Sequence, residues 1–77
     1  MREFIAKHNP EAILWDGCDD AIIGITEKGQ AIYSIERLWE VFMEQGMSDE
    51  EAVEWVDYNI ICAYVGEFTP IHVNTND

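Results

Sequence analysis

The chain has 77 residues and a mass of 8.9 kDa, which is enough for one small domain. Hydrophobic residues make up 48 % of it, which excludes a disordered acidic tail, and 16 acidic against 4 basic residues give a net charge of −12. That charge argues against direct nucleic-acid binding and against attachment to an anionic membrane, because both partners are polyanions.

The start of the chain and its cysteines suggest the compartment. No apolar run approaches the length of a membrane span, and Glu3 stands where a signal peptide would begin its apolar core. We therefore expect a cytoplasmic protein in which Cys18 and Cys62 stay thiols. A single domain should span residues 1–77, with an ordered core over about 4–73 and a frayed tail over 74–77.

The first half of the chain predicts three short strands. Apolar runs at 12–15, 21–25 and 31–33 have strand length, and the second is rich in isoleucine. Gly24 within it suggests a β-bulge or a close approach of another backbone. Residues 27–30 include Gly29 and are typical of a hairpin loop, so the second and third strands should pair antiparallel.

The second half changes to a helical period. Ser34 is a suitable N-cap for a first helix, and Gly46 is placed to end it. Ser48 and Glu51 match a capping box for a second helix, which should end near residues 65–66. The buried positions of the two helices should be Ile35, Leu38, Trp39, Phe42 and Met43, and then Ala52, Trp55, Val56, Asn59, Ile60 and Ala63.

A short final strand at 71–73 completes the order β-β-β-α-α-β. Strands followed by helices predict an α+β fold, a small antiparallel sheet with two helices packed on one face. The short turn between the helices makes them antiparallel neighbours.

Acidic residues recur along both predicted helices without Lys or Arg at the compensating positions four residues on, and only Arg37 is nearby. Their spacing of three or four places each row on one side of its helix. The rows are either a solvated face that keeps the protein soluble, or a surface that imitates a phosphate backbone and occupies a basic groove. Two tyrosines off the buried stripe are either anchors for a partner or peripheral core residues. The candidate partner-binding residues are Glu36, Glu40, Glu44, Glu50, Glu54, Asp57, Tyr58 and Tyr64.

A second acidic cluster comprises Asp16, Asp19 and Asp20. Three carboxylates could hold a hard cation, but their spacing does not match an EF-hand, and a turn in which aspartates accept backbone N–H bonds is favoured. His8 and His72 lack partners at zinc spacing and should lie on the surface. No phosphate-binding loop or activated nucleophile is apparent, so we expect neither an enzyme nor a cofactor.

Two stretches of the chain carry a resemblance to a known group of proteins. One comprises residues 13–17 and 19–24, and the other comprises residues 51–52, 58–59, 63–67 and 69–71. Over about residues 11–73 the chain resembles a family of short acidic proteins encoded by bacteriophages, most of them uncharacterised. The resemblance brings no catalytic residues. It implies a phage accessory protein acting inside a bacterium, a class that includes anti-CRISPR proteins and other inhibitors of host defence.

These features together favour one function over two alternatives. The favoured function is a non-enzymatic phage protein that binds and inhibits a basic host protein or ribonucleoprotein complex in the bacterial cytoplasm, as a monomer or small homo-oligomer. The first alternative is a structural or homo-oligomeric phage protein without an inhibitor role. The second is a weak metal-binding protein that uses the turn at residues 16–20.

Overall fold

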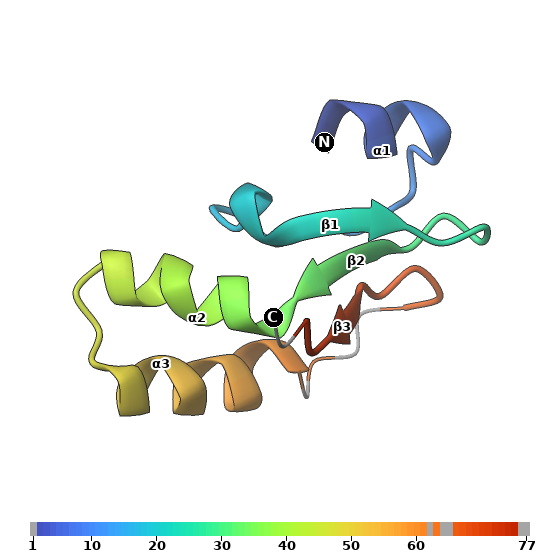
Figure 1. The fold of residues 1–77 in the computed structure, drawn as a ribbon. Coiled ribbons are helices and arrows are strands. Elements are labelled where there is room, and N and C mark those ends of the chain that lie inside the picture. The colour runs from blue at the N-terminus through green and yellow to red at the C-terminus, as the bar shows by residue number, and fades with distance from the viewer. Residues whose placement is uncertain (1, 62, 64–65, 76–77) are drawn as a thin grey trace.

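The computed structural model describes residues 2–61, 63 and 66–75, and it confirms the α+β class. Three strands form one sheet, and helices lie at its side and beyond its end (Figure 1). In chain order the elements are α1 (Arg2–His8), the 3-10 turn η1 (Asp19–Ala21), β1 (Ile22–Ile25), β2 (Ala31–Ser34), α2 (Ile35–Glu44), α3 (Asp49–Val56), the π-helical segment η2 (Asp57–Ile61) and β3 (Ile71–Val73).

The sheet has the order β1-β2-β3 and is mixed. Strands β1 and β2 pair antiparallel, which confirms the predicted hairpin, and their register is irregular between Ile22 and Gly24, where a bulge was one of the two expectations. The prediction of a purely antiparallel sheet is wrong, because β3 runs parallel to β2. Gln30 Nε2, just before β2, donates to the Thr69 carbonyl at 3.0 Å, so the chain has returned to the start of β2 before β3 begins. From there β3 can only run in the direction of β2.

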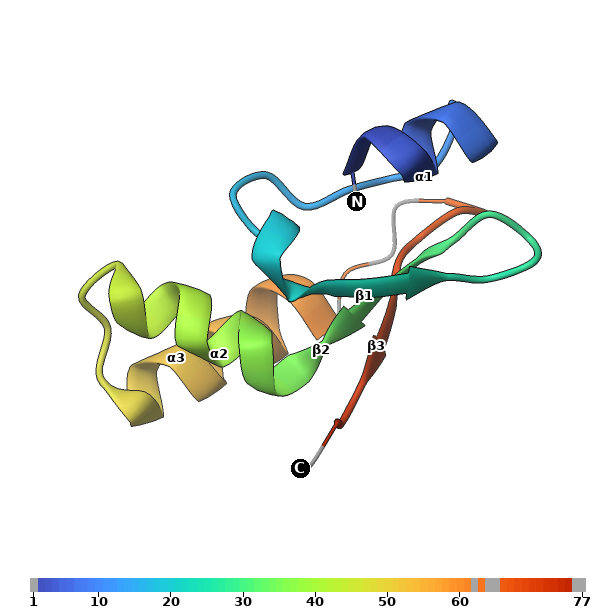
Figure 2. The same ribbon diagram turned by 45° about the horizontal axis from the view of Figure 1, so that its top comes forward.

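Helices α2 and α3 form the expected antiparallel pair, and their local signals act as predicted. The Ser34 side chain accepts from the Arg37 N–H, and Ser48 with Glu51 completes the capping box. Gly46 has a φ of 108°, the left-handed conformation that ends a helix. Since α2 continues directly from β2, the helix pair projects beyond the end of the sheet (Figures 1 and 2).

The N-terminal part differs from the prediction. Residues 2–8 form helix α1, which was not expected, and residues 12–15 are not a strand. The Trp15 N–H donates to the Tyr33 hydroxyl at 2.9 Å, so a side chain takes the place of a neighbouring strand. Asn9 ends α1 and donates through Nδ2 to the Gly29 carbonyl at 3.1 Å. Gly29 has a φ of 100°, and a Cβ there would lie 2.5 Å from Asn9 Nδ2, so both conformation and space require glycine.

One hydrophobic core joins these parts. Its buried members come from α1, the turn around η1, the hairpin, α2 and the α3–η2 segment, namely Ile5, Cys18, Ala21, Ile22, Ala31, Tyr33, Leu38, Val56 and Ile60. Within α3 and η2 the predicted stripe is only partly right. Ala52, Val56 and Ile60 are buried, whereas Trp55 and Asn59 are exposed.

The change to a π-helical hydrogen-bond pattern at Asp57 ends α3 earlier than the predicted 65–66. A π-helical turn needs more residues per turn than an α-helix, so it rotates the residues that follow. Asn59 is exposed like Trp55, and its Nδ2 donates to the Trp55 carbonyl at 3.1 Å. Gly66, where the helix was expected to stop, has a φ of 126°.

At the C-terminus the expected fraying does not reach Thr75. The Thr75 N–H and hydroxyl both donate to Glu36 Oε1, at 2.8 and 3.1 Å. The Thr75 hydroxyl also lies 2.8 Å from the Ser34 hydroxyl. The described part of the tail is therefore attached to the start of α2, and residues 76–77 of the predicted frayed segment lie outside the described residues.

Candidate functional site

The acidic row predicted on α2 is divided by the tertiary structure. Glu36 is partly buried and accepts two hydrogen bonds from Thr75, so it serves the C-terminal segment. Glu40 and Glu44 are exposed and line a groove together with Asp20 of η1 and Arg37. A cation therefore lies among these carboxylates, and the α2 row is not an uninterrupted acidic surface.

The acidic row on α3 is continuous. Glu50 and Glu54 line one shallow groove with Asp49 and Val53. Glu54 also lines a second groove with Asp57, Tyr58 and Ile61. Among the residues that the structure describes, no basic side chain approaches Glu50, Glu54 or Asp57 within ion-pair distance. We call the surface formed by Glu50, Glu54, Asp57 and Tyr58 the α3 surface.

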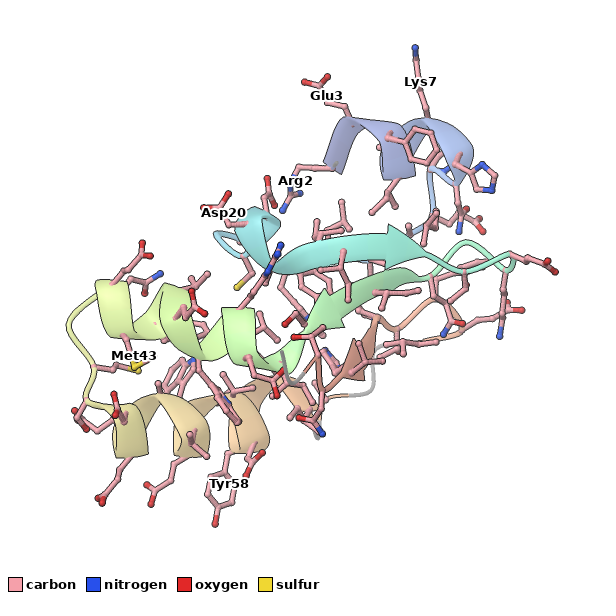
Figure 3. All side chains as sticks on the ribbon, viewed as in Figure 1. Arg2, Glu3, Lys7, Asp20, Met43 and Tyr58 are labelled. Atoms are coloured by element: carbon pink, nitrogen blue, oxygen red, sulfur yellow. The ribbon has the colours of Figure 1, made fainter. Side chains whose placement is uncertain are left out.

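The two acidic groups lie on different sides of the helix pair. The groove that contains Glu40 and Glu44 includes Asp20, and none of its residues borders the grooves on α3. Figure 3 shows Asp20 beside α2 on the side of η1, whereas Tyr58 extends from the opposite edge of the pair, beyond α3. The predicted binding residues are thus brought together on α3 but not across both helices.

Exposed aromatic rings accompany the carboxylates of the α3 surface. The Tyr58 side chain is 79 % exposed, which excludes the alternative of peripheral core packing. Trp55 is 44 % exposed, and its ring packs against Phe42 of α2 with centroids 6.0 Å apart. The sequence pattern placed Trp55 in the core; the structure turns part of its ring toward solvent. Tyr64, the other predicted anchor, lies outside the described residues.

One carboxylate at the edge of the α3 surface has a structural role. Glu51 Oε1 accepts the Ser48 N–H at 2.9 Å. This backbone bond lowers the pKa of Glu51, and the Ser48 hydroxyl adds a smaller effect in the same direction. Both hydrogen bonds favour the ionised carboxylate. Glu51 is therefore held in place by the capping box, whereas Glu54 makes no such contact with another described residue.

The acidic cluster at residues 16–20 is organised around Arg2. The Arg2 Nε lies 2.8 and 2.9 Å from the two oxygens of Asp19, and Nη2 lies 4.0 Å from Asp16. Arg2 Nη2 also donates to the Trp15 carbonyl at 3.2 Å. A guanidinium thus occupies the place at which a cation was considered. Over the described ranges, no group of three or more acidic, histidine or cysteine side chains is arranged to hold a metal ion.

A contact between Trp15 and His72 was not foreseen from the sequence. The Trp15 Nε1–H donates to His72 Nε2 at 3.0 Å, and the two ring planes are 10° apart. His72 is half-buried, contrary to the expected surface position, and burial lowers its pKa. The two residues are 57 positions apart, so no local pattern could have paired them.

The described cysteine lacks the environment of a nucleophile. Cys18 is buried in the core, and burial raises the pKa of its thiol, an effect strengthened by Asp19. A raised pKa keeps the sulfur protonated and unreactive. Cys62 lies outside the described residues.

No protein-family model matches the chain, and no match was found among curated proteins or among solved structures. Within the described residues, no helix combines the length and the apolar character needed to cross a membrane. The interpretation of the α3 surface therefore depends on its own chemistry.

Proposed function

We propose that this protein is a non-enzymatic binding domain that uses the α3 surface to occupy a basic, nucleic-acid-binding groove on another macromolecule. In the bacterial setting that the phage resemblance implies, the partner is a host protein or ribonucleoprotein complex, and occupation of its groove inhibits it. An anti-CRISPR protein or another inhibitor of host defence would act in this way.

The observation that carries the proposal is that no basic side chain among the described residues pairs with Glu50, Glu54 or Asp57. Residues 35–57 contain eight acidic residues and one basic residue. On α3 the exposed carboxylates repel one another, since Glu50 and Glu54 are four residues apart and Glu54 and Asp57 are three apart. A partner rich in Lys and Arg would relieve this repulsion and would be steered to the surface at long range.

The exposed rings support the same proposal. Trp and Tyr supply a large share of the binding energy in protein interfaces, where charged rims mainly set orientation and association rate. Trp55 and Tyr58 lie directly among the α3 carboxylates. The surface thus combines long-range attraction with short-range anchors, which a merely solubilising face would not need.

The test is affinity capture from a bacterial lysate with two matched charge variants as baits. One bait carries Glu50→Gln, Glu54→Gln and Asp57→Asn; the other carries Glu27→Gln, Glu40→Gln and Glu44→Gln, which removes the same charge elsewhere. We expect a basic, nucleic-acid-binding protein on the wild type and on the second bait but not on the first. It should be released by duplex DNA or by high salt. Equal capture by both triple variants would contradict the proposal.

A further inference from the structure

A groove along α3 joins the two exposed rings to the carboxylates. It is lined by Met47, Glu51, Glu54, Trp55, Tyr58 and Asn59. On the helix, Glu51 stands four residues before Trp55, and Glu54 stands four residues before Tyr58. Within α3, residues four apart are neighbours on one helix side, which places Glu51 beside Trp55. Tyr58 lies in η2, and it lines both of its grooves together with Glu54.

On one side of the groove the side chains are held by contacts, and on the other side they are exposed. The Phe42–Trp55 contact and the bond from Asn59 Nδ2 to the Trp55 carbonyl hold the backbone and ring of Trp55. Glu51 is held by the Ser48 cap. Glu54 is exposed and its side chain has no hydrogen bond or ion pair with another described residue, and Tyr58 is strongly exposed. The adjoining segment η2 is π-helical, a local geometry that is frequent at functional sites.

We propose that this groove binds an arginine side chain of the partner, with the guanidinium stacked on the Tyr58 and Trp55 rings and hydrogen-bonded to Glu54. This inference rests on the proposed function and identifies the group that the α3 surface recognises. Arginine fits better than lysine, because its planar guanidinium can stack on a ring while its fork of N–H groups meets a carboxylate. A lysine ammonium offers only a compact charge.

The charge of the groove excludes other occupants. An apolar side chain would remove the Glu54 carboxylate from water without giving it a partner, which is costly. A second copy of this chain would bring its own net charge of −12 to the same place. A cation with a flat, weakly hydrated face satisfies both the rings and the carboxylates.

The experiment follows the indole N–H resonance of Trp55 by NMR during titration with two peptides, acetyl-Gly-Gly-Arg-Gly-Gly-amide and its lysine counterpart. We expect the arginine peptide to bind about threefold more tightly than the lysine peptide. Tyr58→Leu should weaken arginine binding by about threefold, whereas Tyr58→Phe keeps the ring and should stay within about twofold. Because Tyr58 is so exposed, both variants should fold, as thermal melts will verify. Phe4→Leu, which removes an exposed ring outside the groove, is the control that should change nothing.

The outcomes separate this inference from the proposed function. Equal binding of both peptides, unchanged by Tyr58→Leu but weakened by Glu54→Gln, would overturn the arginine groove and leave an acidic docking surface. No shift of the Trp55 resonance at millimolar peptide would also overturn the arginine groove, and lysate capture by the α3 surface would then decide the proposed function alone. If both the arginine peptide and the lysate partner still bound the triple variant of Glu50, Glu54 and Asp57, the arginine groove and the proposed function would both be overturned.

Discussion

Two acidic regions of this molecule look alike in the sequence and differ in the folded protein. The turn at residues 16–20 faces Arg2, whose guanidinium contacts both oxygens of Asp19. The α3 surface has no such counter-ion among the described residues. The first region is held to the core through Trp15, by the Tyr33 hydroxyl and by His72, whereas the second lies open beside two exposed rings.

The difference shows that the density of carboxylates does not reveal their role. An acidic residue that is held by a cation or a hydrogen-bond donor of its own chain contributes to the fold, and one that lacks both is available to a partner. Four predictions test this distinction, and they are ordered by the expected change in the free energy of unfolding.

The largest effect should come from the anchor of the acidic turn. Tyr33→Phe removes the hydroxyl that accepts the Trp15 N–H and leaves that N–H without its partner. We expect a loss of about 1–3 kcal/mol in the free energy of unfolding, measured by urea denaturation followed by circular dichroism. Tyr58→Phe removes the same atom from an exposed ring of the α3 surface and should leave stability unchanged. Equal effects would erase the contrast between the regions.

The second prediction concerns pH and the Trp15–His72 contact. Burial lowers the pKa of His72, so the unfolded chain binds this proton more readily than the folded one. The contribution of His72 to the free energy of unfolding is fully present above about pH 6.5, which is the ordinary pKa of histidine. This contribution decreases as the pH falls toward the lowered pKa of the folded protein. His72→Gln keeps an acceptor for the Trp15 indole but does not titrate. The difference in stability between wild type and this variant should therefore depend on pH below about 6.5; a constant difference would contradict it.

The third prediction concerns the ion pair of the turn. Arg2→Ala and Asp19→Asn should each lower the free energy of unfolding by up to about 1 kcal/mol, a modest value because both side chains are partly exposed to solvent and salt. Lys28→Ala, in the exposed hairpin loop, is the matched loss of a cation and should have no measurable effect. Chemical denaturation at low salt is the appropriate measurement. An unchanged Asp19→Asn variant would mean that the pair does not stabilise the turn.

The smallest effect should have the opposite sign. Glu54→Gln removes repulsion with Glu50 and Asp57 and should raise the free energy of unfolding by a few tenths of a kcal/mol. Several hundred millimolar NaCl should raise the melting temperature of the wild type for the same reason, and should raise it less in the variant. Loss of stability on Glu54→Gln would show that this carboxylate has a favourable contact within the folded chain.

Much of the local structure could be predicted because its causes are local. The Ser34 cap, the Ser48–Glu51 capping box and the β1–β2 hairpin depend on residues a few positions apart. Helix α1 was missed because only Ile5 of its seven residues is buried, which leaves no apolar period to detect. The run at 12–15 has the composition of a strand, but the sheet of the described residues contains only β1, β2 and β3, and the Trp15 N–H bonds the Tyr33 side chain instead.

The candidate site was predictable in composition and not in arrangement. Spacing placed Glu50, Glu54 and Asp57 on one side of a helix, and their exposure agrees with this. It also grouped Glu36 with the binding residues, whereas Thr75 draws this side chain to the C-terminal segment. It assigned Trp55 to the core, whereas the ring packs against Phe42 of α2 at the edge of the helix pair and is 44 % exposed.

Sequence was sufficient for the properties that depend on composition and on near neighbours: the net charge, the α+β class, the helix caps and the hairpin. Tertiary structure decided the direction of β3, the pairing of Trp15 with His72, and which carboxylates meet a cation. These features join residues that are far apart in the chain. Their contacts depend on where the whole backbone brings each side chain, and the pattern within any one segment does not contain that information.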